Sequence, residues 1–331
     1  MSRHQRAKEY MTKCALIGRE ILKLKLLDND EVALVEVLDK QSVGEFKLPD
    51  FVTGLLGSLE DRGAFQNCKF RKINISKCKV YGDSIVNLFG DCKQLEEVQL
   101  EDFDTRNVLY MDSAFVNCTS LKSIDMSKLD TSKTISMSYM FYCCRLIESI
   151  DLSHNNLNRV QDLTSTFRYC TSLKSVNLGI HNTNKLEVIE AMFEGCISLK
   201  EVDMSGLNFD KLYNANYLFY DCSSLKDLRF SANKVDSLTT TEEMFANCNS
   251  LEKIDLSCLT TNIIEDMSGM FGNCTSLNYI DMRNISSESL VYYDEMFKNC
   301  PAKVNVDLSK FHIDEIKSRL YKIKRSNKGE I

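Results

Sequence analysis

One hydrophobic pattern recurs through most of the chain, and it consists of a Phe followed three residues later by a Cys. The pairs are Phe65/Cys68, Phe89/Cys92, Phe115/Cys118, Phe141/Cys144, Phe167/Cys170, Phe193/Cys196, Phe219/Cys222, Phe245/Cys248, Phe271/Cys274 and Phe297/Cys300. The first step between pairs is 24 residues long, and each later step is 26 residues long. A constant period of about 20–50 residues is typical of solenoids, propellers and other repeat arrays. The spacing therefore predicts stacked repeats rather than independent globular domains.

A second pattern follows the Cys in each repeat, where a large aliphatic residue precedes an apolar–polar–apolar triplet. The triplets occupy residues 98–100, 124–126, 150–152, 176–178, 202–204, 228–230, 254–256, 280–282 and 306–308. Strict alternation over so few residues predicts a short strand with one buried face. A single strand cannot pair within its own repeat, so we expect it to pair in parallel and in register with the next one.

A third pattern lies between the predicted strands and has the spacing of a helix. Met137, Met140, Phe141 and Cys144 fall at positions i, i+3, i+4 and i+7, and the repeats that end at Cys196 and Cys274 keep this spacing. Such a stripe predicts a helix of about two turns that buries one face. Each repeat is therefore expected to run strand, turn, short helix, turn, which gives an α/β solenoid with a parallel sheet on one face.

The repeat resembles a known family. Leu121-x-x-Ile124-x-Met126 matches the Leu-x-x-Leu-x-Leu core of leucine-rich repeats. The fuller unit, Met-x-x-Met-Phe-x-x-Cys-x-Ser-Leu-x-x-Ile-Asp-Leu-Ser, resembles the BspA-type repeat, which is also known from mycoplasma-type surface lipoproteins. The resemblance covers about residues 65–310 and implies a right-handed superhelix of about ten coils. It also implies adhesion to host or matrix proteins and a cell-surface or secreted location.

The sequence departs from this family in two ways. Phe103, Leu129, Leu207 and Leu259 occupy the position where Asn or Cys is usual in leucine-rich repeats, so an asparagine ladder is not expected. Residues 1–25 are basic, but charged residues interrupt their apolar positions. A secretory signal needs about 7–15 uninterrupted apolar residues. The visible N-terminus therefore predicts a cytoplasmic protein, against the location that the resemblance implies.

The regions outside the repeats are expected to cap the solenoid. We predict an N-terminal capping region at 1–64, the repeat solenoid at 65–310, and a capping helix with a basic tail at 311–331. Within the first region the patterns predict an amphipathic helix in 1–25, strands at 31–38 and 44–48, and a short helix near 51–59. Caps of this kind cover apolar surface and strand edges that the terminal coils would otherwise expose.

Composition and charge narrow the range of functions. The chain of 331 residues has a net charge of −6 and four His. The two ends are basic and the middle is strongly acidic, so nucleic-acid binding is not expected. The chain contains no apolar run of about 18 residues, and no transmembrane segment is expected. We find no phosphate-binding glycine loop, nucleophile elbow or zinc-protease motif, and we predict no catalytic residue.

The repeated Cys residues are predicted to be reduced and buried, because they share one apolar stripe with Phe and Met. The predicted repeat core comprises Phe115, Cys118, Phe141, Cys144, Phe167, Cys170, Phe193, Cys196, Phe219, Cys222, Phe245, Cys248, Phe271 and Cys274. No Cys-x-x-Cys pair is present, and neither a metal site nor a cofactor is expected. Neighbouring coils would bring successive Cys residues within disulfide range, but a reducing cytosol opposes such bridges.

The outward position of the predicted strands is the candidate ligand-binding column. It contains Asp125, Asp151, Asn177, Asp203, Arg229, Asp255, Asp281 and Asp307. Carboxylates stacked about 4.8 Å apart repel one another, so they must be solvated, hydrogen-bonded to nearby Ser or Thr, or bridged by cations. The sequence leaves three interpretations open: a structural Asp–Ser ladder, a docking surface for a basic partner, or a Ca²⁺ site that Arg229 and Asn177 would interrupt.

Tyrosines crowd certain repeats, notably Tyr213, Tyr217 and Tyr220 in one of them. Tyrosines in this pattern fit either an interface or packing within the coil.

The function that the sequence favours is a non-enzymatic, monomeric scaffold that binds a protein ligand on the exposed sheet. The alternative is an intracellular adaptor or effector whose basic termini contact membrane or nucleic acid. An enzyme would need a cluster of titratable groups in a pocket, and residues 1–64 do not supply one.

Overall fold

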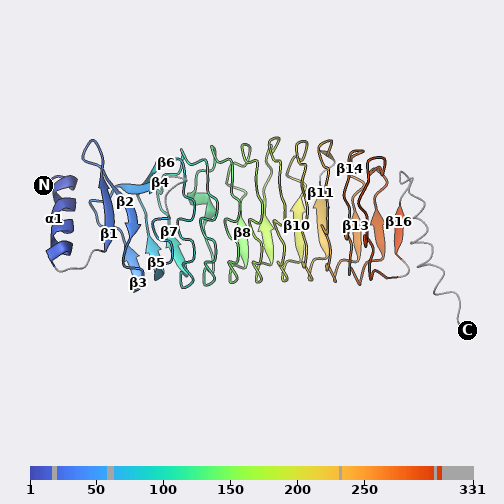
Figure 1. Cartoon of the computed structure of the whole chain (residues 1–331), viewed down its shortest axis with the longest axis horizontal. Coiled ribbons are helices and arrows are strands. Elements are labelled where there is room, and N and C mark those ends of the chain that lie inside the picture. The colour runs from blue at the N-terminus through green and yellow to red at the C-terminus, as the bar shows by residue number, and fades with distance from the viewer. Residues whose placement is uncertain (17–20, 58–62, 231–232, 302–303, 308–331) are drawn as a thin grey trace, which may run out of the picture.

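The computed structural model describes residues 1–16, 21–57, 63–230, 233–301 and 304–307. The chain forms one elongated stack of coils, with the N-terminal helix at one end and the last repeats at the other (Figure 1). Coil follows coil along the long axis in sequence order, so each coil contacts chiefly the coil before it and the coil after it. The repeat solenoid predicted from the sequence is therefore confirmed.

A helix and a four-stranded sheet lie at the N-terminal end of the stack, and we call them the cap. Helix α1 (Arg3–Leu16) packs against strand β2, and Tyr10 of α1 contacts Phe51 at a ring-centroid distance of 5.6 Å. The cap sheet has the order β1-β2-β4-β6 and is formed by β1 (Leu22–Leu26), β2 (Val32–Val37), β4 (Gly54–Gly57) and β6 (Lys79–Gly82). The short helix predicted near 51–59 is wrong, because residues 54–57 form β4, whose glycines let the neighbouring strand approach closely.

Except for the one at 124–126, the predicted strands are present but short, and their sheet is interrupted. The pieces have the orders β3-β5-β7, β8-β9, β10-β11 and β13-β15-β16. Their bounds are β3 Val43–Lys47, β5 Lys69–Asn74, β7 Glu97–Gln99, β8 Ser149–Asp151, β9 Ser175–Asn177, β10 Glu201–Met204, β11 Asp227–Phe230, β13 Lys253–Asp255, β15 Tyr279–Asp281 and β16 Asn305–Asp307. All of these pairs are parallel, and from β8 onward partners lie one 26-residue repeat apart, as Ser149 opposite Ser175 shows.

The other elements are minor. Strands β12 (Asn233–Lys234) and β14 (Leu259–Thr260) form a two-stranded piece. In the repeat that contains Asp125, the expected strand is replaced by a 3₁₀ turn, η1 (Met126–Lys128). The predicted C-terminal helix within 311–331 lies outside the described residues.

The short helices predicted in every repeat are wrong. In the repeat at 137–144, Tyr139 and Cys143 have φ values of 57° and 60°, where a right-handed helix requires about −63°. Two left-handed residues per coil stop a helix from forming and produce consecutive tight turns instead. Met140 donates to the Met137 carbonyl at 3.2 Å and Cys144 to the Phe141 carbonyl at 2.9 Å, which are three-residue spans. The helical spacing of apolar residues therefore comes from turns that point every third or fourth side chain inward.

The N–H groups that are not used within the turns bond to the next coil. Tyr139, Phe141 and Cys143 donate to carbonyls of Thr164, Thr166 and Arg168 at 2.8 to 2.9 Å. A continuous ladder of parallel bridges precedes these turns and links Ser84, Tyr110, Ser136, Asp162, Val188, Asn214, Thr240, Asp266 and Tyr292. We call this side of the molecule the turn-ladder face. It is the uninterrupted hydrogen-bonded face of the solenoid, whereas the sheet of predicted strands is broken.

The core is a column of stacked Phe rings. Successive repeat Phe residues from Phe65 to Phe297 have ring centroids 5.0 to 5.8 Å apart and are nearly parallel. The predicted core residues, Phe115, Cys118, Phe141, Cys144, Phe167, Cys170, Phe193, Cys196, Phe219, Cys222, Phe245, Cys248, Phe271 and Cys274, are all buried. Each interior ring is therefore packed between two others, and its loss leaves a cavity that neither neighbouring coil can fill.

We expect Phe193→Ala to lower the free energy of unfolding by about 3–5 kcal/mol, because it removes a fully buried ring from the middle of the stack. The matched control is Ile197→Ala, since Ile197 lies in the same coil and is 46% exposed. Urea denaturation followed by circular dichroism measures both. Equal losses for the two variants would contradict the stacked-ring core.

Candidate sites on the sheet face

The Cys column is arranged for packing. Each repeat Cys from Cys92 to Cys300 donates its thiol hydrogen to the Phe carbonyl of the preceding repeat, with Sγ–O distances of 2.9 to 3.1 Å. All of the cysteines are free thiols. Burial raises the pKa of Cys68 to about 11 and the pKa of Cys92 to about 12. Such thiols are poor nucleophiles and poor metal ligands, because both roles need the thiolate.

The outward column does not consist of facing, unpartnered carboxylates. Asp125, Asp151, Asp203 and Asp255 each accept a hydrogen bond from the backbone N–H of the Ser two residues later, at 2.9 to 3.1 Å. The Oγ atoms of Ser127, Ser205 and Ser257 add a second bond to the same carboxylates. These bonds form an Asx turn at the end of the strand, so each Asp of this type has a hydrogen-bond partner within its own coil.

The remaining members of the column are held differently. Asn177 accepts from the N–H of Gly179 at 3.1 Å, and Arg229 lies 3.9 Å from the Asp203 carboxylate, with which it forms an exposed ion pair. Asp307 is opposite Asp281 in the β15–β16 register, but its side chain lies outside the described part of the structure. The serine bonds lower the pKa of Asp151 and of Asp203, which keeps both groups ionised.

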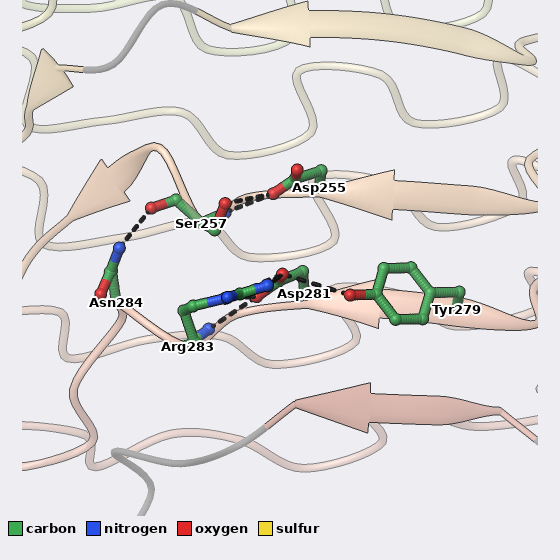
Figure 2. A network of polar contacts seen from close by, with 6 residues as sticks. All are labelled: Asp255, Ser257, Tyr279, Asp281, Arg283 and Asn284. Atoms are coloured by element: carbon green, nitrogen blue, oxygen red, sulfur yellow. Dashed lines mark hydrogen bonds and ion pairs between the residues drawn. The ribbon is translucent and has the colours of Figure 1, made fainter.

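Asp281 differs from the rest of the column because it is only 1% exposed. Figure 2 shows its carboxylate between Tyr279 and Arg283, while the neighbouring Asp255 turns toward Ser257. Nε of Arg283 lies 2.9 Å from both carboxylate oxygens, and the hydroxyl of Tyr279 donates to Asp281 at 3.2 Å. The hydrogen bond from Arg283 is the main cause of a lowered pKa of Asp281. The repulsion expected between stacked Asp255 and Asp281 is therefore relieved by a cation from the same strand end.

Two hollows lie on the sheet face where the sheet is interrupted. One, of about 500 Å³, lies between β11 and β13 and is lined by Lys226, Asp227, Lys253, Asp255 and Tyr279, among others. The second, of about 420 Å³, lies between β7 and the coil of Asp125 and includes Gln99 and Lys128 in its lining. Both have mixed charge. Sequence reasoning missed these hollows, because the breaks in strand pairing leave no mark in the 26-residue pattern.

Metal binding has no support in the described residues. Within the part of the chain that the structure describes, no group of three or more His, Cys, Asp or Glu side chains could hold a metal ion. No helix in the described ranges is long and apolar enough to cross a membrane.

Comparison with known proteins identifies the family. A family model described as "Mycoplasma protein of unknown function, DUF285" matches residues 83–201, 144–253 and 214–328, which overlap and together span most of the chain. The chain belongs to this DUF285 family. No curated protein matches it in sequence.

One solved structure supports the fold of this DUF285 protein. A leucine-rich repeat protein from Bacteroides ovatus aligns with a TM-score of 0.54 at 18% identity, covering 87% of this chain and 77% of the other. A leucine-rich repeat protein from T. pallidum is 20% identical over 70% of this chain and 88% of its own, with a TM-score of 0.37. The first of these supports a leucine-rich-repeat solenoid, and the predicted resemblance to bacterial leucine-rich repeats is confirmed.

We expect the stability of the DUF285 protein to fall steeply above about pH 8.5, where thiols of an unfolded chain ionise. The buried thiols have raised pKa values, so the folded state keeps protons that the unfolded state has already lost, and the free energy of unfolding decreases as pH rises. Urea denaturation between pH 7 and 10 measures this decrease. The variant Cys170→Ala/Cys196→Ala should show a shallower decrease, and an unchanged slope would contradict the role of the thiols.

Asp281→Ala should cost about 2 kcal/mol at pH 7, because it removes a buried carboxylate that accepts charge-assisted hydrogen bonds from Arg283 and a bond from Tyr279, whereas the half-exposed Arg283 stays solvated. Asp255→Ala should cost only about 1 kcal/mol, since it removes an exposed turn-capping carboxylate. The lowered pKa of Asp281 means that its contribution is present at neutral pH and is lost as pH falls below about 4. Urea denaturation at pH 7 and pH 3 tests this, and a pH-independent difference between the variants would argue against the ion pair.

Proposed function

We propose that this DUF285 protein is a non-enzymatic scaffold that binds a protein partner on its sheet face. The observation that carries the proposal is the pair of open hollows flanking an ordered column of exposed polar side chains. Because Asx turns hold the carboxylates of this column in place, little side-chain entropy remains to be lost on binding. A long exposed surface on a rigid stack is suited to protein recognition rather than to catalysis in an enclosed, water-free pocket.

The chemistry of the sheet face indicates how a partner would be held. Arg229 is central in the outward column, its side chain is 69% exposed, and it lies on β11, the strand that borders the hollow lined by Lys253. Exposed Arg and Tyr side chains at the rim of a hollow are typical of the residues that contribute most to protein interfaces. The candidate ligand-binding residues are therefore Asp125, Asp151, Asn177, Asp203, Arg229 and Asp255, with Asp281 and Arg283 as structural support for Tyr279. We further propose that the protein acts as a monomer and, from the family resemblance, at the cell surface.

A second candidate function is the adaptor whose basic ends contact an anionic membrane or nucleic acid. Exposed Arg3, Lys8 and Lys13 on α1 favour it, because they place positive charge on the outer side of the cap. If the basic ends bind the partner, salt should weaken binding, and substitutions on the sheet face should not change it. The two candidates therefore differ in which substitution abolishes binding.

The test begins with affinity capture from extracts of the native host, followed by binding measurements with the purified partner. Arg229→Glu should weaken that binding at least about tenfold, since it reverses a charge at the centre of the proposed surface. Lys133→Glu is the matched control, because it makes the same charge change at an exposed residue outside the strands. Equal effects of the two variants, or binding that only salt abolishes, would contradict the sheet-face scaffold. The latter result would support the adaptor.

A further inference from the structure

A strip of tyrosines lies on the turn-ladder face, outside the site described above. It consists of Tyr139, Tyr142, Tyr169, Tyr217 and Tyr220. Ring centroids of Tyr139 and Tyr142 are 5.9 Å apart, those of Tyr142 and Tyr169 are 5.7 Å apart, and those of Tyr217 and Tyr220 are 5.9 Å apart. All five side chains are at least partly exposed. We call this group the tyrosine strip.

The two halves of the tyrosine strip are joined through one coil. Tyr169 N–H donates to the Glu194 carbonyl at 2.7 Å, and Gly195 N–H donates to the Tyr220 carbonyl at 2.8 Å. The Tyr169 ring lies over Gly195, where an added Cβ would come within 2.3 Å of the ring. The strip therefore follows consecutive coils, and from Tyr139 to the coil of Glu243 it spans about 19 Å at ~4.8 Å per coil.

The chain itself shows which ligand such a surface can bind. The guanidinium of Arg168 lies 5.0 Å from the centroid of the Tyr169 ring and pairs with Glu194 at 2.7 Å. The Tyr169 hydroxyl donates to the same Glu194 oxygen at 2.7 Å. A cation is thus held between an aromatic ring and a carboxylate, which is the arrangement that favours Arg in recognition sites.

The neighbouring half of the strip has the ring and the carboxylates of this arrangement but not the cation. Glu242 and Glu243 lie beside Tyr217, and Asp221 and Glu243 lie beside Tyr220. None of the three carboxylates takes part in an ion pair among the described residues. Burial, followed by the charges of Glu242, Glu295, Asp221 and Glu194, raises the pKa of Glu243. The carboxylates here are crowded by like charge, which a bound cation would relieve.

We propose that the tyrosine strip and its carboxylates form a second docking surface that binds an extended, arginine-rich segment of another protein. An Arg side chain of the partner would stack on Tyr217 or Tyr220 and pair with Glu242 or Glu243, as Arg168 does with Tyr169 and Glu194. Charge complementarity selects this occupant, because the surface offers several carboxylates and aromatic rings for a cation to contact. An extended segment fits because equivalent positions recur along a nearly straight line of coils.

The test uses fluorescein-labelled Arg-Gly and Lys-Gly repeat peptides with the full chain, read by fluorescence anisotropy at low and physiological ionic strength. Glu242→Gln/Glu243→Gln should weaken binding of the Arg-Gly peptide about tenfold. Asp210→Asn/Asp236→Asn is the matched control, because it removes the same two charges at exposed residues outside the strands and outside the tyrosine strip, and it should change binding less than about twofold. Equal weakening by both double variants would show unspecific charge attraction and would overturn the proposal.

The role of the rings is tested separately. Tyr217→Leu/Tyr220→Leu keeps apolar volume but removes stacking, so it should weaken the Arg-Gly peptide more than the Lys-Gly peptide. No effect on either peptide would overturn the proposal, provided that circular dichroism and the melting temperature show an intact fold. Sedimentation velocity identifies the other possible occupant. Self-association that Glu242→Gln/Glu243→Gln abolishes would assign the strip to a second copy of this chain and not to a foreign segment.

Discussion

The structure depends on the way each coil satisfies its backbone hydrogen bonds on the next coil. Two residues per repeat, such as Tyr139 and Cys143, adopt left-handed conformations. These left-handed residues prevent the hydrogen bonds that a helix would form between its own backbone groups. Every second backbone N–H in the turns therefore donates to a carbonyl of the next coil. A buried N–H without an acceptor is costly, so a coil in this conformation requires a neighbour at one fixed spacing. Repeat length, stacking and the absence of helices in the described repeats follow from this one requirement.

The composition of the core follows from the same spacing. Coils about 4.8 Å apart hold flat rings in near-parallel stacks, which explains why Phe occupies the column from Phe65 to Phe297. The column beside it has room for a small side chain, which can add a second hydrogen bond to the Phe carbonyl of the preceding repeat, since that carbonyl already accepts a backbone N–H. Cys does both, because it packs as a small hydrophobic residue and its thiol donates weakly to that carbonyl at about 3 Å. An Ala would fill part of the space but would leave the carbonyl without this donor.

The sequence predicted the solenoid, its parallel register and its buried columns, because these depend on which residues recur and at what period. It did not predict the turns, since consecutive turns and a helix place apolar residues at the same i, i+3, i+4 spacing. A signal was present: the residue before the repeat Cys is Asp, Asn or Gly at 91, 117, 195, 221, 247, 273 and 299, and these residue types tolerate positive φ. The hollows and the burial of Asp281 could not be predicted, because they arise where coils separate or where one Arg replaces the usual Ser.

The fixed stack also explains how one chain can present two surfaces of different chemistry. Outward residues at equivalent positions of successive coils lie in columns on the same face. Like charges at such a position therefore produce a strong electrostatic potential on that face. On the sheet face, Arg229 and Lys253 lie among carboxylates that are already engaged in Asx turns, and the result is a surface of mixed charge. On the turn-ladder face, Arg168 supplies a counter-ion for Glu194 at one coil, and the next coils toward the C-terminus add carboxylates without adding cations. A backbone that is satisfied between coils constrains the inward columns and leaves the outward ones free. The specificity that we propose for both surfaces therefore lies in the outward columns, where substitution of a side chain without a structural hydrogen bond, unlike Asp281, leaves the stack intact.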